Sequence, residues 1–104
     1  MILRTWRGRA SPTKPNDYVR HFRTNVVAEL RAVEGFLGAT LTRQVRPDDI
    51  EFLVITRWQS MDAIRGFAGD NVGRAVVEPG AVAALVEYDE FVEHYEVIDE
   101  VAPA

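Results

Sequence analysis

His21 and Asn25 are the pair of side chains best suited to proton transfer within one site. They lie four residues apart, and on a helix this spacing places two side chains on the same face. A histidine exchanges protons near neutral pH, so His21 could act as a general base on a bound ligand. The alternative interpretation is that both side chains are solvated beside a hydrophobic stripe.

Four aromatic side chains could form the walls of a cleft beside this pair. Tyr18 and Phe22 belong to the same segment as His21, whereas Trp58 and Phe67 come later in the chain. The Trp58 indole combines a large flat ring with an N–H donor, so it could stack on a ligand and orient it. Equally, Trp58 could fill a corner of the core, and Phe67 is interpreted more simply as a core residue.

Other kinds of site receive little support from the sequence. The chain has no cysteine, which excludes thiolate nucleophiles, disulfides and Cys-ligated metals. His21 and His94 are the two histidines, and no carboxylate motif accompanies them, so we expect no metal site. Gly66, Gly69 and Gly73 lack the GxGxxG spacing, so no nucleotide or flavin cofactor is indicated. For His94 we favour a structural or interface role over a place in the cleft.

The elements that must position these residues follow from hydrophobic periodicity and turn residues. Alternation of polar and apolar residues predicts strands over 2–9, 36–45, 50–58 and 91–101. A pattern with helical spacing starts at Asn16 or Asp17, which can cap it, and Gly35 supplies a left-handed stop. Ser60 caps a short helix over 61–67, and Pro79 begins another that extends to about residue 86.

This order of elements, β-α-β-β-α-β, predicts an α+β fold: a ferredoxin-like antiparallel sheet with its helices on one face. At 104 residues the chain is expected to form one domain over 1–101, followed by a frayed tail at 102–104. The other face of the sheet needs a cover, and the chain has no spare element to supply it. A second copy of the same sheet is the simplest cover, so we expect a homodimer forming an α/β barrel.

Charge and hydropathy narrow the range of partners. Residues 1–46 carry a net charge of +6 and residues 47–104 carry −10. A basic arm for nucleic acid is one interpretation, but the basic residues are scattered singly, which favours two halves that interleave and neutralise each other. We therefore expect no nucleic-acid partner. No apolar run approaches the roughly 20 residues that cross a bilayer, and the N-terminus lacks a signal-like apolar region. No membrane partner and a cytoplasmic location are the resulting expectations.

Three segments resemble the antibiotic biosynthesis monooxygenase family: VEGFLG at 33–38, LVITRWQSMDA at 53–63 and FVEHYEV at 91–97. The resemblance implies an intimate homodimer with an apolar cleft between the sheet and the helices of each subunit. Members of this family include cofactor-independent oxygenases that form quinones, quinol oxygenases, haem-degrading enzymes and stress-linked proteins. Trp58 stands at the position of the family's strand-end tryptophan, where it would wall the cleft and position an oxygen-bearing ligand.

The haem-degrading branch uses an Asn on the first strand and an axial His on the second helical region. This chain offers only Thr5 as a small neutral polar group on the first strand, and it has no histidine between Ser60 and Tyr88. Haem degradation by that route is therefore not expected.

The leading hypothesis is a cofactor-independent monooxygenase, or a related oxidoreductase, that acts on a planar aromatic or phenolic small molecule. In it, the catalytic residues are His21, Asn25 and Trp58, and the substrate-binding residues are Tyr18, Phe22, Trp58 and Phe67. Two alternatives remain open. One is a non-catalytic dimeric module that binds small molecules or serves in stress. The other is a haem-binding protein with altered ligation through His21 or His94.

Overall fold

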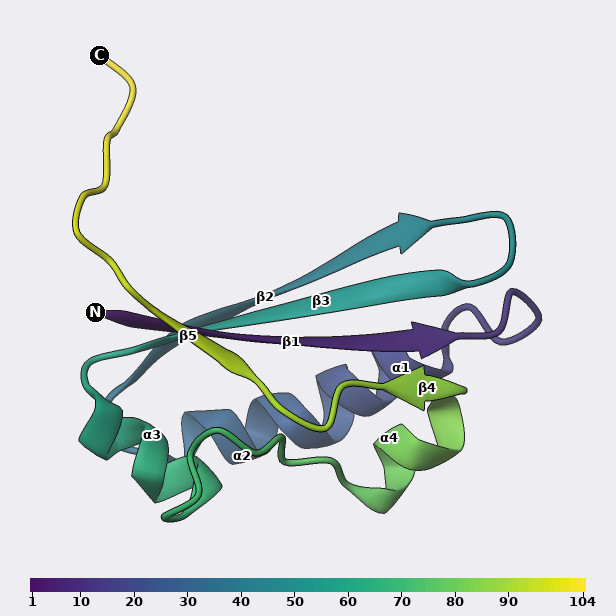
Figure 1. Ribbon diagram of the computed structural model, residues 1–104, viewed down its shortest axis with the longest axis horizontal. Helices are drawn as coiled ribbons and strands as arrows, with labels where there is room; N and C mark the ends of the chain where they lie inside the picture. Colours follow the sequence, from purple (N-terminus) through teal and green to yellow (C-terminus); the bar gives the residue numbers. More distant parts are fainter.

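The computed structural model describes residues 1–104, and its strands and helices follow one another in the order that the sequence predicts, except that the last strand is divided (Figure 1). The strands are β1 (Ile2–Ala10), β2 (Phe36–Val45), β3 (Ile50–Trp58), β4 (Glu87–Tyr88) and β5 (Glu93–Glu96). The helical segments are α1 (Asp17–His21), η1 (Phe22–Val26), α2 (Val27–Arg31), α3 (Met61–Ala68) and α4 (Pro79–Ala84).

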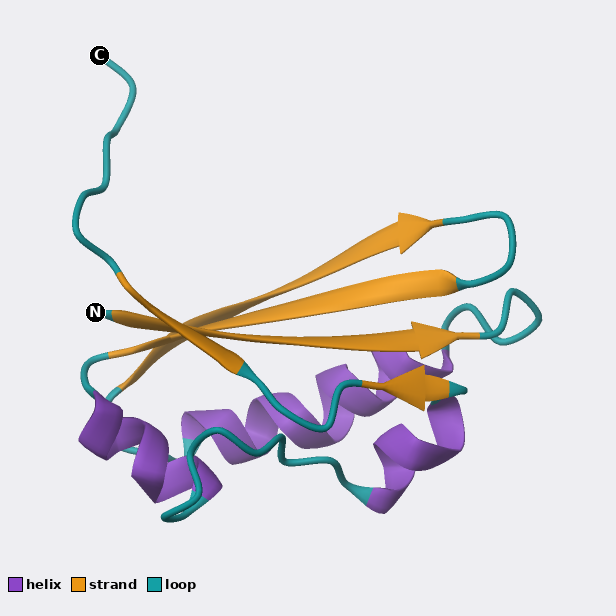
Figure 2. Cartoon of the chain, viewed as in Figure 1, coloured by secondary structure: helices purple, strands orange, loops and turns teal.

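The strands form one antiparallel sheet in the order β2-β3-β1-β4, with β5 also paired to β1. All helices lie against one face of this sheet and leave the other face bare (Figure 2). This is the predicted α+β, ferredoxin-like arrangement. The register between β2 and β3 shifts between Phe36 and Gly38, as at a β-bulge.

The last strand differs from the prediction of a single strand over 91–101. Two short strands, β4 and β5, pair with opposite ends of β1. Between them the chain turns away to the segment 70–78, where Ala75 donates its backbone N–H to Glu90 and Val92 donates to Gly73. The last hydrogen bond between this segment and β1 is the one that Val97 donates to the carbonyl of Met1. The preceding helix, α4, ends at Ala84 rather than near residue 86.

The first helical region is continuous from α1 through η1 to α2, but it contains a π turn. Val27 donates its backbone N–H to Phe22, five residues earlier, instead of four. Asn16 precedes the first turn without a side-chain capping bond, contrary to the prediction for that residue. The helix also ends earlier than predicted, at Arg31, because the next two N–H groups form tighter bonds to residues three positions back.

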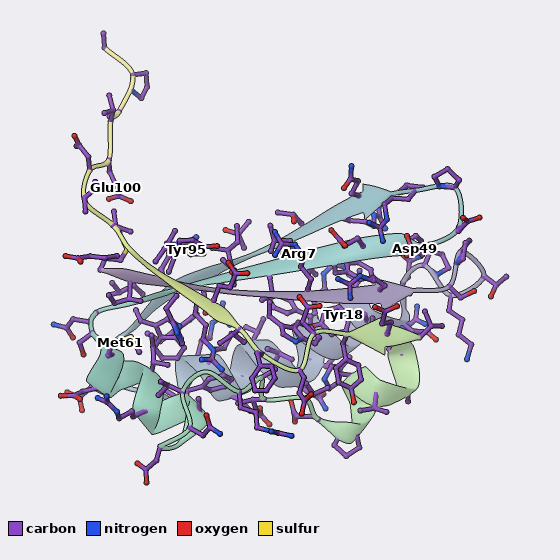
Figure 3. All side chains as sticks on the ribbon, viewed as in Figure 1. Arg7, Tyr18, Asp49, Met61, Tyr95 and Glu100 are labelled. Carbon is purple, nitrogen blue, oxygen red and sulfur yellow. The ribbon has the colours of Figure 1, made fainter.

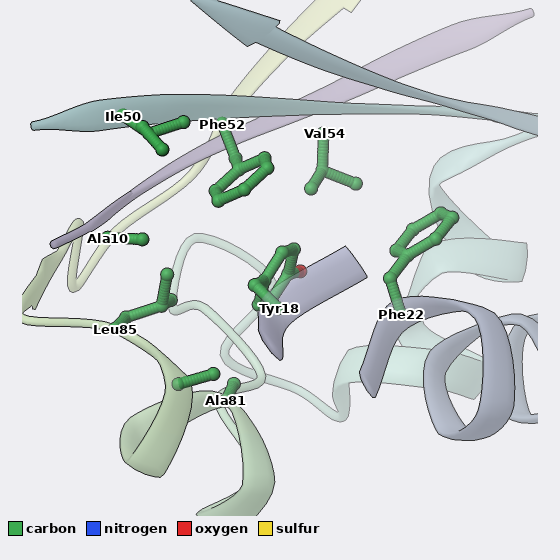
Figure 4. Close-up of a cluster of buried hydrophobic side chains, with 9 residues drawn as sticks. Ala10, Tyr18, Phe22, Ile50, Phe52, Val54, Ala81 and Leu85 are labelled. Carbon is green, nitrogen blue, oxygen red and sulfur yellow. The ribbon is translucent and has the colours of Figure 1, made fainter. Parts of the chain in front are cut away.

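Two hydrophobic clusters lie between the sheet and the helices. Tyr18 is at the centre of the larger cluster, where its ring packs 5.3 Å from that of Phe52, with Leu85 and Ala81 beside it (Figure 4). The smaller cluster contains Leu30, Trp58 and Ile64. In β3 every second residue, from Ile50 to Trp58, is buried, which shows that even-numbered positions face the helices.

The basic and acidic halves of the chain do interleave, as the charge pattern predicts. Arg9 on β1 lies within 3.4 Å of carboxylate oxygens of Glu51, Glu87 and Asp89, and Arg46 pairs with Glu51 as well. Positive charge from the first half is thereby neutralised by negative charge from the second.

None of the helices is long and apolar enough to cross a membrane.

Gly35→Val tests the turn that leads from the first helical region into β2. Gly35 has a φ of 89°, and a Cβ at this position would lie 2.5 Å from the Cβ of Ala63. A β-branched residue should lower the free energy of unfolding by about 2 kcal/mol or more, through backbone strain and this contact. The control is Gly73→Val, because a Cβ at Gly73 has no neighbour within 4 Å. Equal stability of the two variants in urea titrations would contradict the prediction.

Candidate active site

A small cavity lies between the sheet and the helical layer, with a volume of about 60 Å³. Most of its lining is hydrophobic, from β1, β3, the first helical region, α3, α4 and the segment 75–78. Figure 3 shows Tyr18 on this side of the sheet and Tyr95 on the opposite side. Four residues bring polar groups to the cavity wall: Arg4, His21, Thr56 and Glu78.

His21 lies at the cavity wall, where its imidazole Nε2 is buried and has no hydrogen-bond partner. Only 9% of its side chain is exposed, and the nearest carboxylate oxygen, on Glu78, is 3.7 Å from Nε2. The opposite edge of the ring packs on α4, since a Cβ at Gly80 would lie 2.5 Å from Nδ1. The imidazole is therefore fixed in position with one nitrogen free.

Tyr18 and Trp6 contribute aromatic surface next to His21. The Tyr18 ring lies 6.0 Å from the imidazole and 5.8 Å from Trp6, measured between ring centroids. Burial, and then the negative charge of Glu78, raise the pKa of the Tyr18 phenol, so this hydroxyl remains protonated and able to donate. Trp6 uses its indole N–H in a 2.7 Å hydrogen bond to the carbonyl of Asp89.

Arg4, Thr56 and His94 form a row across three strands on the helix side of the sheet. Arg4 on β1 pairs in register with Thr56 on β3 and with His94 on β5. Nη1 of Arg4 lies 3.0 Å from Nε2 of His94. Burial, and then the charge of Arg4, lower the pKa of His94, so the imidazole is neutral and its Nε2 accepts this hydrogen bond. His94 thus lies on the helix side of the sheet, hydrogen-bonded to a residue of the cavity wall.

Trp58 is fully buried and does not line the cavity. Its ring packs between Phe36 and Phe67, at centroid distances of 5.4 and 5.6 Å. The indole N–H is occupied by a 2.8 Å hydrogen bond to Oγ1 of Thr56, which does line the cavity. Trp58 therefore supports a cavity residue and has neither a free donor nor an open ring face for a ligand.

The remaining predicted site residues separate into two groups. Phe67 lines the cavity together with Tyr18 and His21, as the sequence suggested. Phe22 is a core residue and Asn25 is exposed, and neither lines the cavity. The π turn explains the placement of Asn25, because a wider turn brings Val26, five residues after His21, to the cavity wall in its place.

Sequence reasoning missed Arg4, Trp6, Thr56 and Glu78. Alternation along β1 could have revealed the first two, since Ile2, Arg4, Trp6, Gly8 and Ala10 share one face of a strand. An arginine among these apolar and small residues is an unusual inward-facing charge. Glu78 gave no such signal, because it belongs to an irregular segment whose path depends on tertiary contacts.

His94→Gln tests the neutral state of His94. Because the pKa of His94 is lower in the folded protein than the usual 6.5, the unfolded chain binds a proton first as the pH falls. The stability contributed by neutral His94 is therefore complete above pH 6.5 and is lost as the pH falls towards the folded pKa. We expect wild type to lose more unfolding free energy between pH 7 and pH 5.5 than His94→Gln, measured by urea titration. Equal losses would show that His94 titrates normally.

Comparisons with known proteins show which family and which solved structures this chain is similar to. The family model for antibiotic biosynthesis monooxygenase matches residues 1–79. No curated protein sequence matches the chain.

Solved structures share the fold over the whole chain. A Bacillus cereus protein described as an antibiotic biosynthesis monooxygenase has 20% identity and a TM-score of 0.69, covering 98% of this chain and 97% of the other. The haem degrader MhuD from Mycobacterium tuberculosis, with two haems bound, has 20% identity and a TM-score of 0.63, covering 98% and 100%. SnoaB, a cofactor-independent oxygenase from Streptomyces nogalater, has 18% identity and a TM-score of 0.60, covering 99% and 98%.

At these identities the structural likeness establishes the fold alone, whereas the family model matches the sequence itself over most of its length. From that match, the chain belongs to the antibiotic biosynthesis monooxygenase family.

Proposed function

We propose that this protein is a cofactor-independent monooxygenase that oxidises a planar aromatic or phenolic small molecule in the cavity between its sheet and its helices. The observation that carries the proposal is Nε2 of His21, which is buried at a mostly hydrophobic cavity and forms no hydrogen bond, the nearest carboxylate oxygen being 3.7 Å away on Glu78. SnoaB, which shares the fold, is a cofactor-independent oxygenase, and the reaction class is the one suggested by the family.

In the proposed reaction, Nε2 of His21 takes a proton from a phenol or from the activated CH₂ of an anthrone-like ring. The resulting anion supplies the electrons that reduce molecular oxygen. One oxygen atom becomes the new carbonyl of the product and the other leaves as water, so a CH₂ group and O₂ give C=O and H₂O. The carboxylate of Glu78, 3.7 Å from Nε2, would stabilise the imidazolium that forms. Hydrophobic walls favour the step by excluding water from the anion.

The size of the cavity places a condition on this proposal. The volume of the cavity is about 60 Å³. Ligand pockets usually measure about 300–1,000 Å³. Entry of an aromatic ring therefore requires part of the cavity wall to move outwards, and we assign this movement to Ala75 and Val76 because their segment is irregular and partly exposed.

His21→Ala tests the base. With an anthrone as substrate, we expect wild type to consume oxygen and to release a quinone, and His21→Ala to be about a hundredfold slower. Its thermal stability should fall less than its activity. The control is Thr24→Ala, an exposed residue of the same helical region, which should retain full activity. Absence of oxygen uptake by wild type, or equal rates for His21→Ala and wild type, would refute the proposed reaction.

Gly80→Ala gives a second variant that keeps the imidazole but displaces it. The new Cβ would lie 2.5 Å from Nδ1 and 2.8 Å from Cε1 of His21, so the ring must move. A fall in kcat with this variant, and none with Gly73→Ala, would show that the position of His21 matters and not merely its presence.

A homodimer is part of the proposal, because the bare face of the sheet needs a cover. Leu3, Leu53 and Ile55 lie on that face, opposite the helices. We expect the protein to sediment as a dimer at micromolar concentration, and Ile55→Glu to shift it towards the monomer by burying a charge in the contact. Ala28→Glu, at an exposed position of α2, is the matched control. A monomeric wild type would refute the dimer.

The free nitrogen of His21 also favours a second candidate, a haem-binding protein, and MhuD shares the fold. Titration with haemin separates the two. A shifted Soret band that is lost in His21→Ala would favour haem binding. If the protein responds to neither haemin nor phenols, the non-catalytic module is the remaining candidate.

A further inference from the structure

Arg4 is a buried cation to which the proposed reaction assigns no role. Only 5% of the residue is exposed, and it lines the same cavity as His21, Trp6 and Tyr18. Burial lowers the pKa of its guanidinium to about 10, so the group keeps its charge at neutral pH. No carboxylate lies within ion-pair distance of it, in contrast to Arg7, Arg9 and Arg46, which each have an acidic partner.

The hydrogen bonds of Arg4 are incomplete. Nη1 donates to the carbonyl of Val72 at 2.5 Å and to Nε2 of His94 at 3.0 Å, and Nη2 donates to the carbonyl of Arg74 at 3.0 Å. A guanidinium has five N–H groups, so the Nε–H and one Nη2–H remain without a protein acceptor. The three acceptors that are present are all neutral, since His94 is held in its uncharged form.

Nearby acidic side chains cannot supply the missing negative charge. Glu51, Glu87 and Asp89 surround Arg9, Glu90 pairs with Arg74, and Glu78 faces His21. A partner subunit on the bare face lies on the wrong side of the sheet, because Arg4 points towards the helices with Thr56 and His94. A buried charge without a counter-ion costs several kcal/mol, so an anionic group of a ligand placed beside Arg4 would offset part of that cost.

We propose that Arg4 receives the carboxylate of the ligand, and that the protein therefore binds planar aromatic carboxylic acids. This inference rests on the proposed function, in which the cavity takes a flat aromatic molecule. The unpaired N–H groups of Arg4 suit a carboxylate, which accepts two hydrogen bonds from a guanidinium. Trp6, Tyr18 and Phe67 supply the ring surface in the same cavity. Anchoring the carboxylate at Arg4 fixes which ring atom is presented to Nε2 of His21.

The competing role is purely structural. Arg4 binds two carbonyls of the segment 70–78, and it could serve only to hold that segment against the sheet. The two roles predict different selectivity: an anion receptor distinguishes a charged ligand from a neutral one of the same shape, whereas a structural clamp affects both equally.

The test compares 2-naphthoate with its neutral isostere 2-naphthamide by isothermal titration calorimetry. We expect wild type to bind naphthoate about tenfold more tightly or better, because a charge-assisted hydrogen bond is worth that factor. Arg4→Gln should remove the preference by weakening naphthoate binding and leaving naphthamide binding unchanged. Arg4→Lys should retain part of the preference for naphthoate. The control Arg65→Gln, on the exposed face of α3, should behave as wild type.

Three results would overturn the proposal: equal affinities in wild type, equal weakening of both ligands by Arg4→Gln, or no binding of either ligand. If Arg4→Gln fails to unfold cooperatively, the preference for naphthoate over naphthamide is compared between wild type and Arg4→Lys instead. Oxygen uptake separates this inference from the proposed function. A naphthoate preference without uptake of oxygen by any phenol would support Arg4 as receptor and refute the monooxygenase. Equal turnover of carboxylated and neutral phenols would support the monooxygenase and refute Arg4 as the receptor of a carboxylate.

Discussion

The register of β1 is the constraint on which the rest of this structure depends. β3 pairs along the whole of β1 on one side, and β4 and β5 pair with its two ends on the other. Side chains alternate along a strand, so this one register sends Arg4 and Trp6 to the helices and Arg7 to the bare face. A slip by a single residue would exchange the two sets and put Arg7 in the interior. The cavity and the open face are thus fixed together.

Close packing on β1 then positions the helical layer. Gly8 leaves room for Leu85, since a Cβ there would lie 2.7 Å from Cδ1 of that side chain. Leu85 directly follows α4, and α4 in turn places Gly80 against the ring of His21. The position of the free imidazole nitrogen therefore depends on contacts that begin at the central strand. Local changes in this chain of contacts would move His21 without altering its chemistry.

The cavity combines two polar groups of different character in hydrophobic surroundings. His21 presents an unpartnered nitrogen near a carboxylate, and Arg4 presents a cation whose protein acceptors are all neutral. In the proposed function, this combination would orient a flat molecule with one anionic group and one acidic proton. The same fold in MhuD holds haem and in SnoaB belongs to a cofactor-independent oxygenase, so the side chains in the cavity, and not the fold, distinguish the chemistry.

The sequence by itself determined the class of fold and the order of the elements, because these follow from local periodicity and from turn residues such as Ser60, Gly35 and Pro79. It also identified Tyr18, His21 and Phe67, which share one cavity. Tertiary structure alone decided that Trp58 is sealed in the core and that a π turn excludes Asn25 from the cavity. It also decided that Arg4 meets His94 and that the last strand divides in two. These features depend on contacts between residues far apart in the chain, and periodicity carries no information about which distant groups will meet.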